Sequence, residues 1–208
     1  MKVSVIPSVL DTTIKGFNER YAIAKSLSPK VHIDIMDGSF VLRKAPALSK
    51  LDDFKGAQAH LMVSRPDEYV SELKNKNCAG IIFHFESCPD RIKEVSDLIH
   101  QYKMKSYLAI KPQTEIRDIE PFLEEVDGFL IMGVEPGVEH QAMLSEAYER
   151  IASLRSKTKK PILFDGGVRL KNAAKLVNAG VTELVSGSYI FESKSPQKAF
   201  KELKAAVK

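Results

Sequence analysis

The sequence predicts an α/β protein, and within that class a closed (β/α)₈ barrel. Eight short β-like runs begin roughly every 20 to 30 residues, and segments with helical apolar spacing lie between them. Most runs are apolar enough to be covered on their outer face, which is typical of parallel sheets. Eight units in 208 residues give about 26 residues per unit, near the lower size limit of such a barrel.

The strands are expected at the eight β-like runs. In chain order these are Val3–Ser8, Val31–Met36, Ala57–Met62, Gly80–Glu86, Lys105–Lys111, Gly128–Val134, Pro161–Asp165 and Glu183–Ser188.

The helices are expected where apolar residues recur at helical spacing. These segments are Phe17–Leu27, Pro66–Lys76, Asp90–Tyr102, Ile116–Val126, Ser145–Lys157, Asn172–Gly180 and Pro196–Val207. Several have Pro, Ser or Asp near their start, and Gly180 is a stop signal. A further short helix is expected within Pro46–Phe54.

An open doubly wound sheet is the alternative arrangement of the same elements. No GxGxxG turn follows any strand, which counts against the dinucleotide-binding version of that fold. Because no low-complexity linker divides the chain, residues 1–208 are expected to form a single barrel domain.

Composition excludes several classes of partner. With 31 basic and 27 acidic residues the net charge is +4, and the basic residues are scattered, so no nucleic acid partner is expected. No apolar stretch has the length of a membrane span, and the beginning of the chain lacks a signal-peptide pattern. Cys78 and Cys88 lack CxxC spacing, so we expect free thiols in a cytoplasmic protein.

The segment HIDIMDG, His32–Gly38, is the most informative stretch of the chain. Alternation in a strand places His32, Asp34 and Met36 on one face and only apolar residues on the other. A buried imidazole and carboxylate need partners, and a metal ion or an active site would supply them. Polar residues at a solvated strand end are the alternative.

Further polar residues stand at other strand ends, where a (β/α)₈ barrel carries its active site. His32, Asp34, His60 and Asp165 together make a candidate metal site with two nitrogen and two oxygen ligands. Zn²⁺, Fe²⁺, Mn²⁺ and Co²⁺ all suit this ligand set. Taken singly, each histidine is better explained as a hydrogen-bonded core residue than as a ligand. His84 and Glu86 are placed in a supporting layer or in a surface pair.

Glycines after the last two strands predict a phosphate site, because they leave backbone N–H groups open. The candidates are Gly166, Gly167, Gly187 and Ser188, with a plain tight turn as the alternative. Met36, Met62 and Met132 share faces with the polar residues. They form either an apolar wall around a reactive intermediate or ordinary core filling.

Several segments, in order, resemble the ribulose-phosphate 3-epimerase family. They are IPSVL (Ile6–Leu10), HIDIMDG, AHLMVSRP (Ala59–Pro66), HFESCP (His84–Pro89), LIMGVEPG (Leu130–Gly137), LFDGG (Leu163–Gly167) and SGSYIF (Ser186–Phe191). HIDIMDG also resembles the allulose-6-phosphate 3-epimerases.

The resemblance implies a ribulose-phosphate-binding barrel that epimerises carbon 3 of a ketose phosphate, such as D-ribulose 5-phosphate or D-xylulose 5-phosphate. It implies one divalent metal ion on His32, Asp34, His60 and Asp165. Asp34 and Asp165 would then be the acid/base pair that acts through an enediolate, with substrate contacts at Ser8, Gly137 and the three methionines. It also implies a homo-oligomer, a dimer or larger.

One loop departs from the family pattern. The family sequence NPGFGGQ reads EPGVEHQ here, Glu135–Gln141, so Gly137 is kept while Glu139 and His140 replace glycines. Arg43 or Lys44 is a candidate to balance the added carboxylate. The altered loop leaves two other readings open: an allulose-6-phosphate 3-epimerase type of hexulose phosphate epimerase, and a non-catalytic sugar-phosphate-binding relative. A hexulose-phosphate-synthase type of enzyme is disfavoured, because DIMDG lacks the lysine of its DxKxxD motif.

Overall fold

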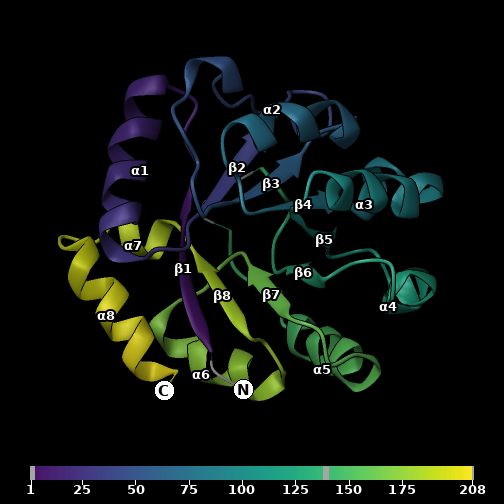
Figure 1. Cartoon of the computed structure of the whole chain (residues 1–208). Coiled ribbons are helices and arrows are strands. Elements are labelled where there is room, and N and C mark those ends of the chain that lie inside the picture. The colour runs from purple at the N-terminus through teal and green to yellow at the C-terminus, as the bar shows by residue number, and fades with distance from the viewer. Residues whose placement is uncertain (1–2, 138–140, 208) are drawn as a thin grey trace.

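Eight parallel strands form a closed barrel in the computed structural model, which describes residues 3–137 and 141–207 (Figure 1). Each strand pairs with its neighbour in the sequence, and the last closes onto the first. The strands are β1 (Ser4–Val9), β2 (His32–Met36), β3 (Gln58–Met62), β4 (Gly80–His84), β5 (Lys105–Ile110), β6 (Gly128–Met132), β7 (Ile162–Asp165) and β8 (Glu183–Ser186). The predicted fold class is therefore confirmed.

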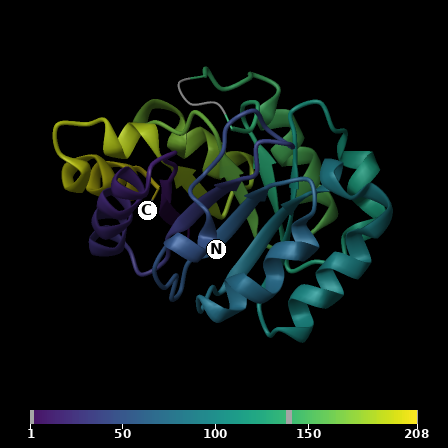
Figure 2. The ribbon, with the colours of Figure 1, turned by 90° about the horizontal axis from the view of Figure 1, so that it is seen from above.

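The α-helices lie outside the strands, as Figures 1 and 2 show. They are α1 (Ile14–Leu27), α2 (Val70–Asn75), α3 (Ile92–Gln101), α4 (Ile116–Ile119), α5 (Ala147–Lys157), α6 (Leu170–Ala179), α7 (Ser188–Phe191) and α8 (Pro196–Ala206). Helix α7, a single turn after β8, was not expected from the sequence. Among the described residues, no helix has the length and apolar character that a membrane crossing requires.

Alternation along the strands separates two apolar cores. Residues such as Ile33 and Phe83 point outward and pack in the large core under the helices. Ile82 and Leu130 belong to a smaller cluster with other alternate strand residues, which fills the barrel. Each fully buried side chain of this size stabilises the fold by about 1.5–3 kcal/mol, so both faces of the sheet contribute.

Several expected helices are shorter than predicted. Within Pro66–Lys76, Pro66–Tyr69 forms a 3₁₀ turn and only Val70–Asn75 is α-helical. In Pro46–Phe54 only Leu48–Lys50 is helical, as a 3₁₀ turn, and its buried residues follow a three-residue spacing that suits this geometry. Helix α4 ends at Ile119 instead of continuing to Val126, and a 3₁₀ turn follows. Pro121 explains the break, because it has no backbone N–H and its ring clashes with a helical carbonyl.

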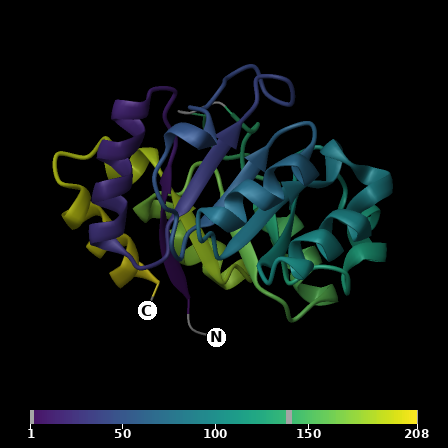
Figure 3. The ribbon, with the colours of Figure 1, turned by 45° about the horizontal axis from the view of Figure 1, so that its top comes forward.

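Strand register brings the polar residues to one end of the barrel. Asp34 aligns with His60 across β2 and β3, and Met132 aligns with Asp165 across β6 and β7. Between β1 and β2, by contrast, only Ser8–His32 and Val9–Ile33 are aligned. Figure 3 shows both chain termini at one side of the barrel and the loop that follows β2 at the other.

The loop after β2 folds over this mouth of the barrel. Asp37 holds it, because its carboxylate accepts hydrogen bonds from the backbone N–H groups of Ser39, Phe40 and Ser64 at 2.7, 2.9 and 2.7 Å. Burial raises the pKa of Asp37, but these donors outweigh it and the net pKa is lowered. The loop reaches the segment after β6, where a Cβ added to Gly137 would lie 2.8 Å from the Cβ of Val41.

Candidate active site and metal centre

Three strands bring His32, Asp34, His60 and Asp165 together. Their possible ligand atoms all lie within 4.8 Å of one another. From Asp34 Oδ1, the distance is 3.3 Å to His32 Nε2 and 3.1 Å to His60 Nδ1. From Asp165 Oδ2, the same nitrogens lie at 3.7 and 3.8 Å. Ligand atoms bound about 2.1 Å from a shared ion are about 3.0–4.2 Å apart, so the donor set fits a divalent metal.

His32 adds a second observation in favour of a cation. It is completely buried, and neither ring nitrogen has a hydrogen-bond partner among the described residues. Burial lowers the pKa of His32, but the charges of Asp34 and Asp165 raise it further, so the net pKa is raised. The two carboxylates thus favour positive charge where the ring nitrogen faces them, and a proton or a metal ion can supply it.

The two carboxyl groups have pKa values on opposite sides of the ordinary range. Burial raises the pKa of Asp34, but His32 and His60 outweigh burial and hold it well below the usual value. The Ser8 hydroxyl also donates a hydrogen bond to Asp34 Oδ2 at 2.6 Å. At Asp165, burial and the charge of Asp34 both act upward and raise the pKa to about 7. Near neutral pH the pair therefore holds one ionised and one partly protonated carboxyl group.

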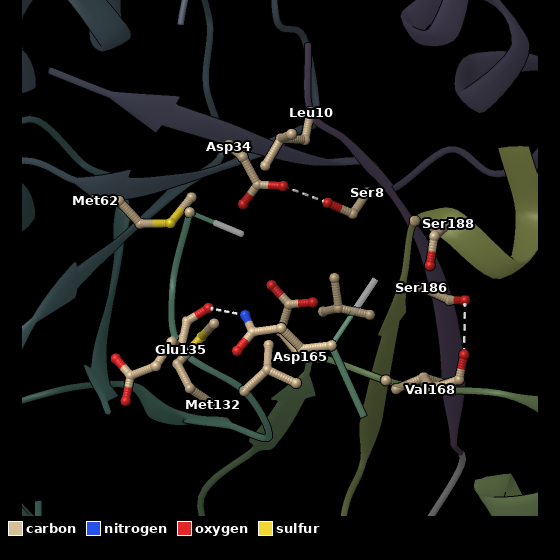
Figure 4. A pocket seen from close by; sticks show the side chains of 17 residues that line it. Ser8, Leu10, Asp34, Met62, Met132, Glu135, Asp165, Val168, Ser186 and Ser188 are labelled. Carbon is tan, nitrogen blue, oxygen red and sulfur yellow. Dashed lines mark hydrogen bonds between the residues drawn. The ribbon is translucent and has the colours of Figure 1, made fainter. Parts of the chain in front are cut away.

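A pocket opens directly above these carboxylates. Figure 4 shows Asp34 and Ser8 joined by a hydrogen bond, with Asp165, from another strand, facing them from below in this view. Its lining comprises Ser8, Leu10, Asp34, Met62, Met132, Val134, Glu135, Gly137, Gln141, Asp165, Gly166, Gly167, Val168, Val185, Ser186, Gly187 and Ser188. No lysine or arginine is among these residues. All the candidate substrate-binding residues except Met36 are present, while His32 and His60 are fully buried and do not line the pocket.

Met36 is not brought to this pocket. Its side chain is 2% exposed and packs with Ala45 and Met62. The loop after β2 turns back over the strand here, and the N–H of Ala45 donates to the Met36 carbonyl at 3.0 Å. The loop thus covers the methionine that strand alternation placed beside His32 and Asp34.

Sequence reasoning missed seven lining residues: Leu10, Val134, Glu135, Gln141, Val168, Val185 and Ser186. Val185 and Ser186 directly precede the predicted Gly187, so the same strand end could have identified them. Leu10 is the last residue of IPSVL. Gln141 carries no comparable signal, because its position depends on the path of the loop after β6.

The altered loop is only partly described. Glu139 and His140 lie outside the described residues, whereas Glu135 is within them. The Glu135 carboxylate accepts a hydrogen bond from the side chain of Gln113, and Figure 4 shows it turned away from Asp165. Arg43 and Lys44 do not line the pocket.

His84 and Glu86 stand behind the four-residue cluster. His84 is completely buried, so the alternative of a surface pair is wrong for this residue. Its Nδ1 lies 3.1 Å from Glu86 Oε2, and its Nε2 lies 2.9 Å from His60 Nε2.

Solved structures share this architecture at low sequence identity. A crystal structure of 3-hexulose-6-phosphate synthase superposes with a TM-score of 0.76 at 12% identity, covering 99% of this chain and 100% of the other. Orotidine 5'-phosphate decarboxylase from Pyrococcus horikoshii OT3 gives 0.68 at 17% identity, covering 97% and 98%. At such identities the similarity shows the fold alone.

Sequence comparison is more specific. The chain is 33% identical to ribulose-phosphate 3-epimerase of Chlamydia pneumoniae, over 93% of this chain and 90% of that protein. It is 29% identical to the enzyme of that name from Schizosaccharomyces pombe, over 100% and 95%. The sequence profile described as "Ribulose-phosphate 3 epimerase family" matches residues 4–191. With a family match over most of its length and the expected cluster at the barrel mouth, the chain belongs to the ribulose-phosphate 3-epimerase family.

Proposed function

We propose that this protein is a metal-dependent isomerase that inverts carbon 3 of a phosphorylated ketose, with D-ribulose 5-phosphate and D-xylulose 5-phosphate as its substrate pair. One observation carries the proposal: Asp34 and Asp165 belong to one pocket, with pKa values on opposite sides of their ordinary value. Inversion at a carbon beside a carbonyl needs one group that removes a proton and another that delivers one. Membership of the family supports the same reaction.

In this mechanism Asp34 is the base of the forward half-reaction. Its depressed pKa keeps it ionised, and the hydrogen bond from Ser8 orients the carboxylate. Asp165, whose pKa burial and the charge of Asp34 raise in the metal-free chain, is the group that returns a proton to the other face of the resulting enediolate. After turnover the protonation states are exchanged, so the same pair serves the reverse reaction.

His32, Asp34, His60 and Asp165 would hold the metal ion. Imidazole and carboxylate ligands together suit Zn²⁺, Fe²⁺, Mn²⁺ and Co²⁺. When bound, such an ion supplies a Lewis acid that polarises the carbonyl and offsets the negative charge that develops on the substrate. The carboxylates hold the protons, and the imidazoles complete the ligand set.

The rest of the pocket suits a sugar phosphate. Met62, Met132 and Val185 give it an apolar surface that excludes water from the reacting carbon. Gly166 and Gly167 have φ values of +109° and +71°, and this left-handed backbone favours residues without a Cβ. With no lysine or arginine in the described lining, backbone N–H groups near these glycines, Gly187 and Ser188 would bind the phosphate.

The proposal extends to the organisation of the protein. Residues 1–208 would form one barrel domain that assembles into a homo-oligomer, a dimer or larger, in the cytoplasm. The resemblance to the family supports the assembly, and light scattering after size-exclusion chromatography measures it.

A solvent-exchange assay tests the reaction. The protein, loaded in turn with each divalent metal, is incubated in D₂O with D-ribulose 5-phosphate or D-allulose 6-phosphate, and deuterium at carbon 3 is followed by NMR. Asp34→Asn and Asp165→Asn are each expected to slow exchange by at least about 10²–10⁴-fold, the usual contribution of a general acid or base. Asp97→Asn, which alters a half-exposed carboxylate on α3, is the matched control.

The outcomes separate the alternatives. Exchange retained in both site variants would overturn the assignment of the acid/base pair. Faster exchange with the hexulose phosphate would favour the allulose-6-phosphate type of enzyme. Binding of both sugars with no exchange in the metal-loaded wild type would favour a non-catalytic sugar-phosphate-binding protein.

A further inference from the structure

A third buried histidine, His84, stands behind the candidate metal ligand His60, and the proposed reaction gives it no role. The rings of His60 and His84 are 5.0 Å apart between centroids, and their Nε2 atoms are 2.9 Å apart. His84 is completely buried and lies outside both the ligand group and the pocket lining. A buried imidazole needs hydrogen-bond partners, so its contacts indicate what it does.

The contact between the two rings fixes the positions of their hydrogens. A hydrogen bond between two imidazole nitrogens requires one donor and one acceptor. His60 Nδ1 faces Asp34 at 3.1 Å, on the side of the proposed ion, and a ligating nitrogen carries no hydrogen. With an ion on Nδ1, the hydrogen of a neutral His60 is therefore on Nε2, and it is donated to Nε2 of His84.

Glu86 is the next hydrogen-bond partner in this chain. If His84 accepts at Nε2, its own hydrogen is on Nδ1, which lies 3.1 Å from Glu86 Oε2. A carboxylate is the acceptor that this position requires. The chain of donors therefore runs in one direction, from His60 through His84 to Glu86.

Glu86 is itself fixed by the loop after β5. Its Oε1 accepts hydrogen bonds from the backbone N–H of Lys111, at 2.8 Å, and from the hydroxyl of Thr114. Arg150 on α5 donates to the carbonyl oxygens of both these loop residues, at 2.8 Å each. The carboxylate is thus held by contacts that reach the helix layer.

An aromatic residue of the loop after β2 covers His84. The ring of Phe40 lies 4.8 Å from that of His84, and the Lys111 ammonium lies 4.0 Å from the Phe40 ring centre. This packing limits the access of water, which would compete for the hydrogen bonds between the rings.

We propose that Glu86 and His84 are positioning residues for the metal site. They hold His60 as the tautomer with hydrogen on Nε2 and so present Nδ1 to a divalent cation. The inference rests on the metal site of the proposed function and adds the two residues that orient one of its ligands. Partners of this kind fix the orientation of a ligating histidine and raise its basicity.

Metal affinity is the first test. Zinc dissociation constants are measured by competition with a chromophoric chelator for the wild type, His84→Leu, Glu86→Gln and His84→Gln. His84→Leu is expected to weaken binding by about 10–100-fold, the usual effect of removing such a partner, and Glu86→Gln by less. His84→Gln should recover part of the affinity, because its amide can accept from His60 and donate to Glu86. His100→Gln is the matched control, since it removes a half-exposed histidine that pairs with Asp127 at 2.9 Å.

The second test reads the tautomer directly. Long-range ¹H–¹⁵N spectra of the zinc-loaded protein are expected to show His60 with its hydrogen on Nε2, and this signature should weaken in His84→Leu. Glu86→Gln keeps the test valid if His84→Leu fails to fold, which circular dichroism reports.

Zinc affinities of both Glu86→Gln and His84→Leu within about twofold of the wild type would overturn this relay from His60 through His84 to Glu86, because His84→Leu is expected to lose about 10–100-fold. A His60 hydrogen on Nδ1 would do the same. A wild type that binds no divalent metal would overturn the metal site of the proposed function, and the relay with it. A wild type that binds zinc, beside variants that bind equally well, would refute the relay alone.

Discussion

Asp165→Asn is expected to stabilise the metal-free protein at neutral pH while it removes activity. Burial and the negative charge of Asp34 raise the pKa of Asp165 from 3.8 to about 7. The Asp165 side chain keeps 17% of its surface exposed at the pocket. Between these pH values the folded chain binds a proton that the unfolded chain does not. Stability therefore falls as pH rises through this window, and the full loss is present above about pH 7.

The size of this effect follows from the same two values. The difference between 3.8 and about 7, at about 1.4 kcal/mol for each pH unit, gives about 4 kcal/mol. Asparagine has nearly the same shape and cannot ionise, so the variant avoids this loss. The advantage of Asp165→Asn should thus be near zero at about pH 4 and should approach about 4 kcal/mol at about pH 8.

Urea denaturation in the presence of EDTA, followed by circular dichroism across this pH range, measures the difference. Asp127→Asn is the control of opposite sign. Burial raises the pKa of Asp127, but Lys105 and the other donors outweigh it and the net pKa is lowered, so its charge stabilises the fold at neutral pH. A pH-independent gain for Asp165→Asn, or a less stable variant at about pH 8, would refute the reasoning. Saturating zinc should reverse the order, because ion binding stabilises only chains that keep the ligand set.

Three further predictions concern two glycines in close contacts and one buried thiol. Gly137→Ala places a Cβ 2.8 Å from the Cβ of Val41, at a residue whose φ of +80° is left-handed. We therefore expect a lower kcat/KM, with partial recovery in the double variant that also carries Val41→Ala. A kcat/KM equal to that of the wild type would contradict this contact. Gly133→Ala places a Cβ 2.4 Å from the Phe164 ring. In urea titrations it should lower the free energy of unfolding by about 1–3 kcal/mol, whereas an unchanged midpoint would show that the ring can move aside. Burial raises the pKa of the Cys78 thiol to about 11. Its reaction with a thiol reagent should therefore be slow in the native protein and fast in urea. Fast labelling of the native protein would show that this part of the core opens.

The barrel was predictable because its signals are local. Each strand is a short apolar run, and alternation along β2 correctly assigned Ile33 and Ile35 to the outer core. Helix ends were less predictable, because one residue such as Pro121 overrides the apolar spacing on both sides of it. The short helix α7 has no periodicity long enough to read.

The chemistry of the candidate site was predictable to the extent that strand ends meet at one mouth of the barrel. Parallel register brings Asp34 beside His60 with no further information. The contact between His60 and His84 needed more, because His60 aligns with Ile82 and the two rings meet diagonally. The covering of Met36 depends on the fold of a loop, which spacing along a strand does not determine.

The short pairing between β1 and β2, here called the β1–β2 seam, links the geometry of the site to local opening of the barrel. Only Ser8–His32 and Val9–Ile33 are aligned across this seam, and the Ser8 hydroxyl crosses it to Asp34. Segments with few backbone bonds are the ones that open first in native-state fluctuations. Any such opening here would separate the serine from the carboxylate that it orients. A ligand that bridges the two strands would therefore also protect the barrel against local unfolding.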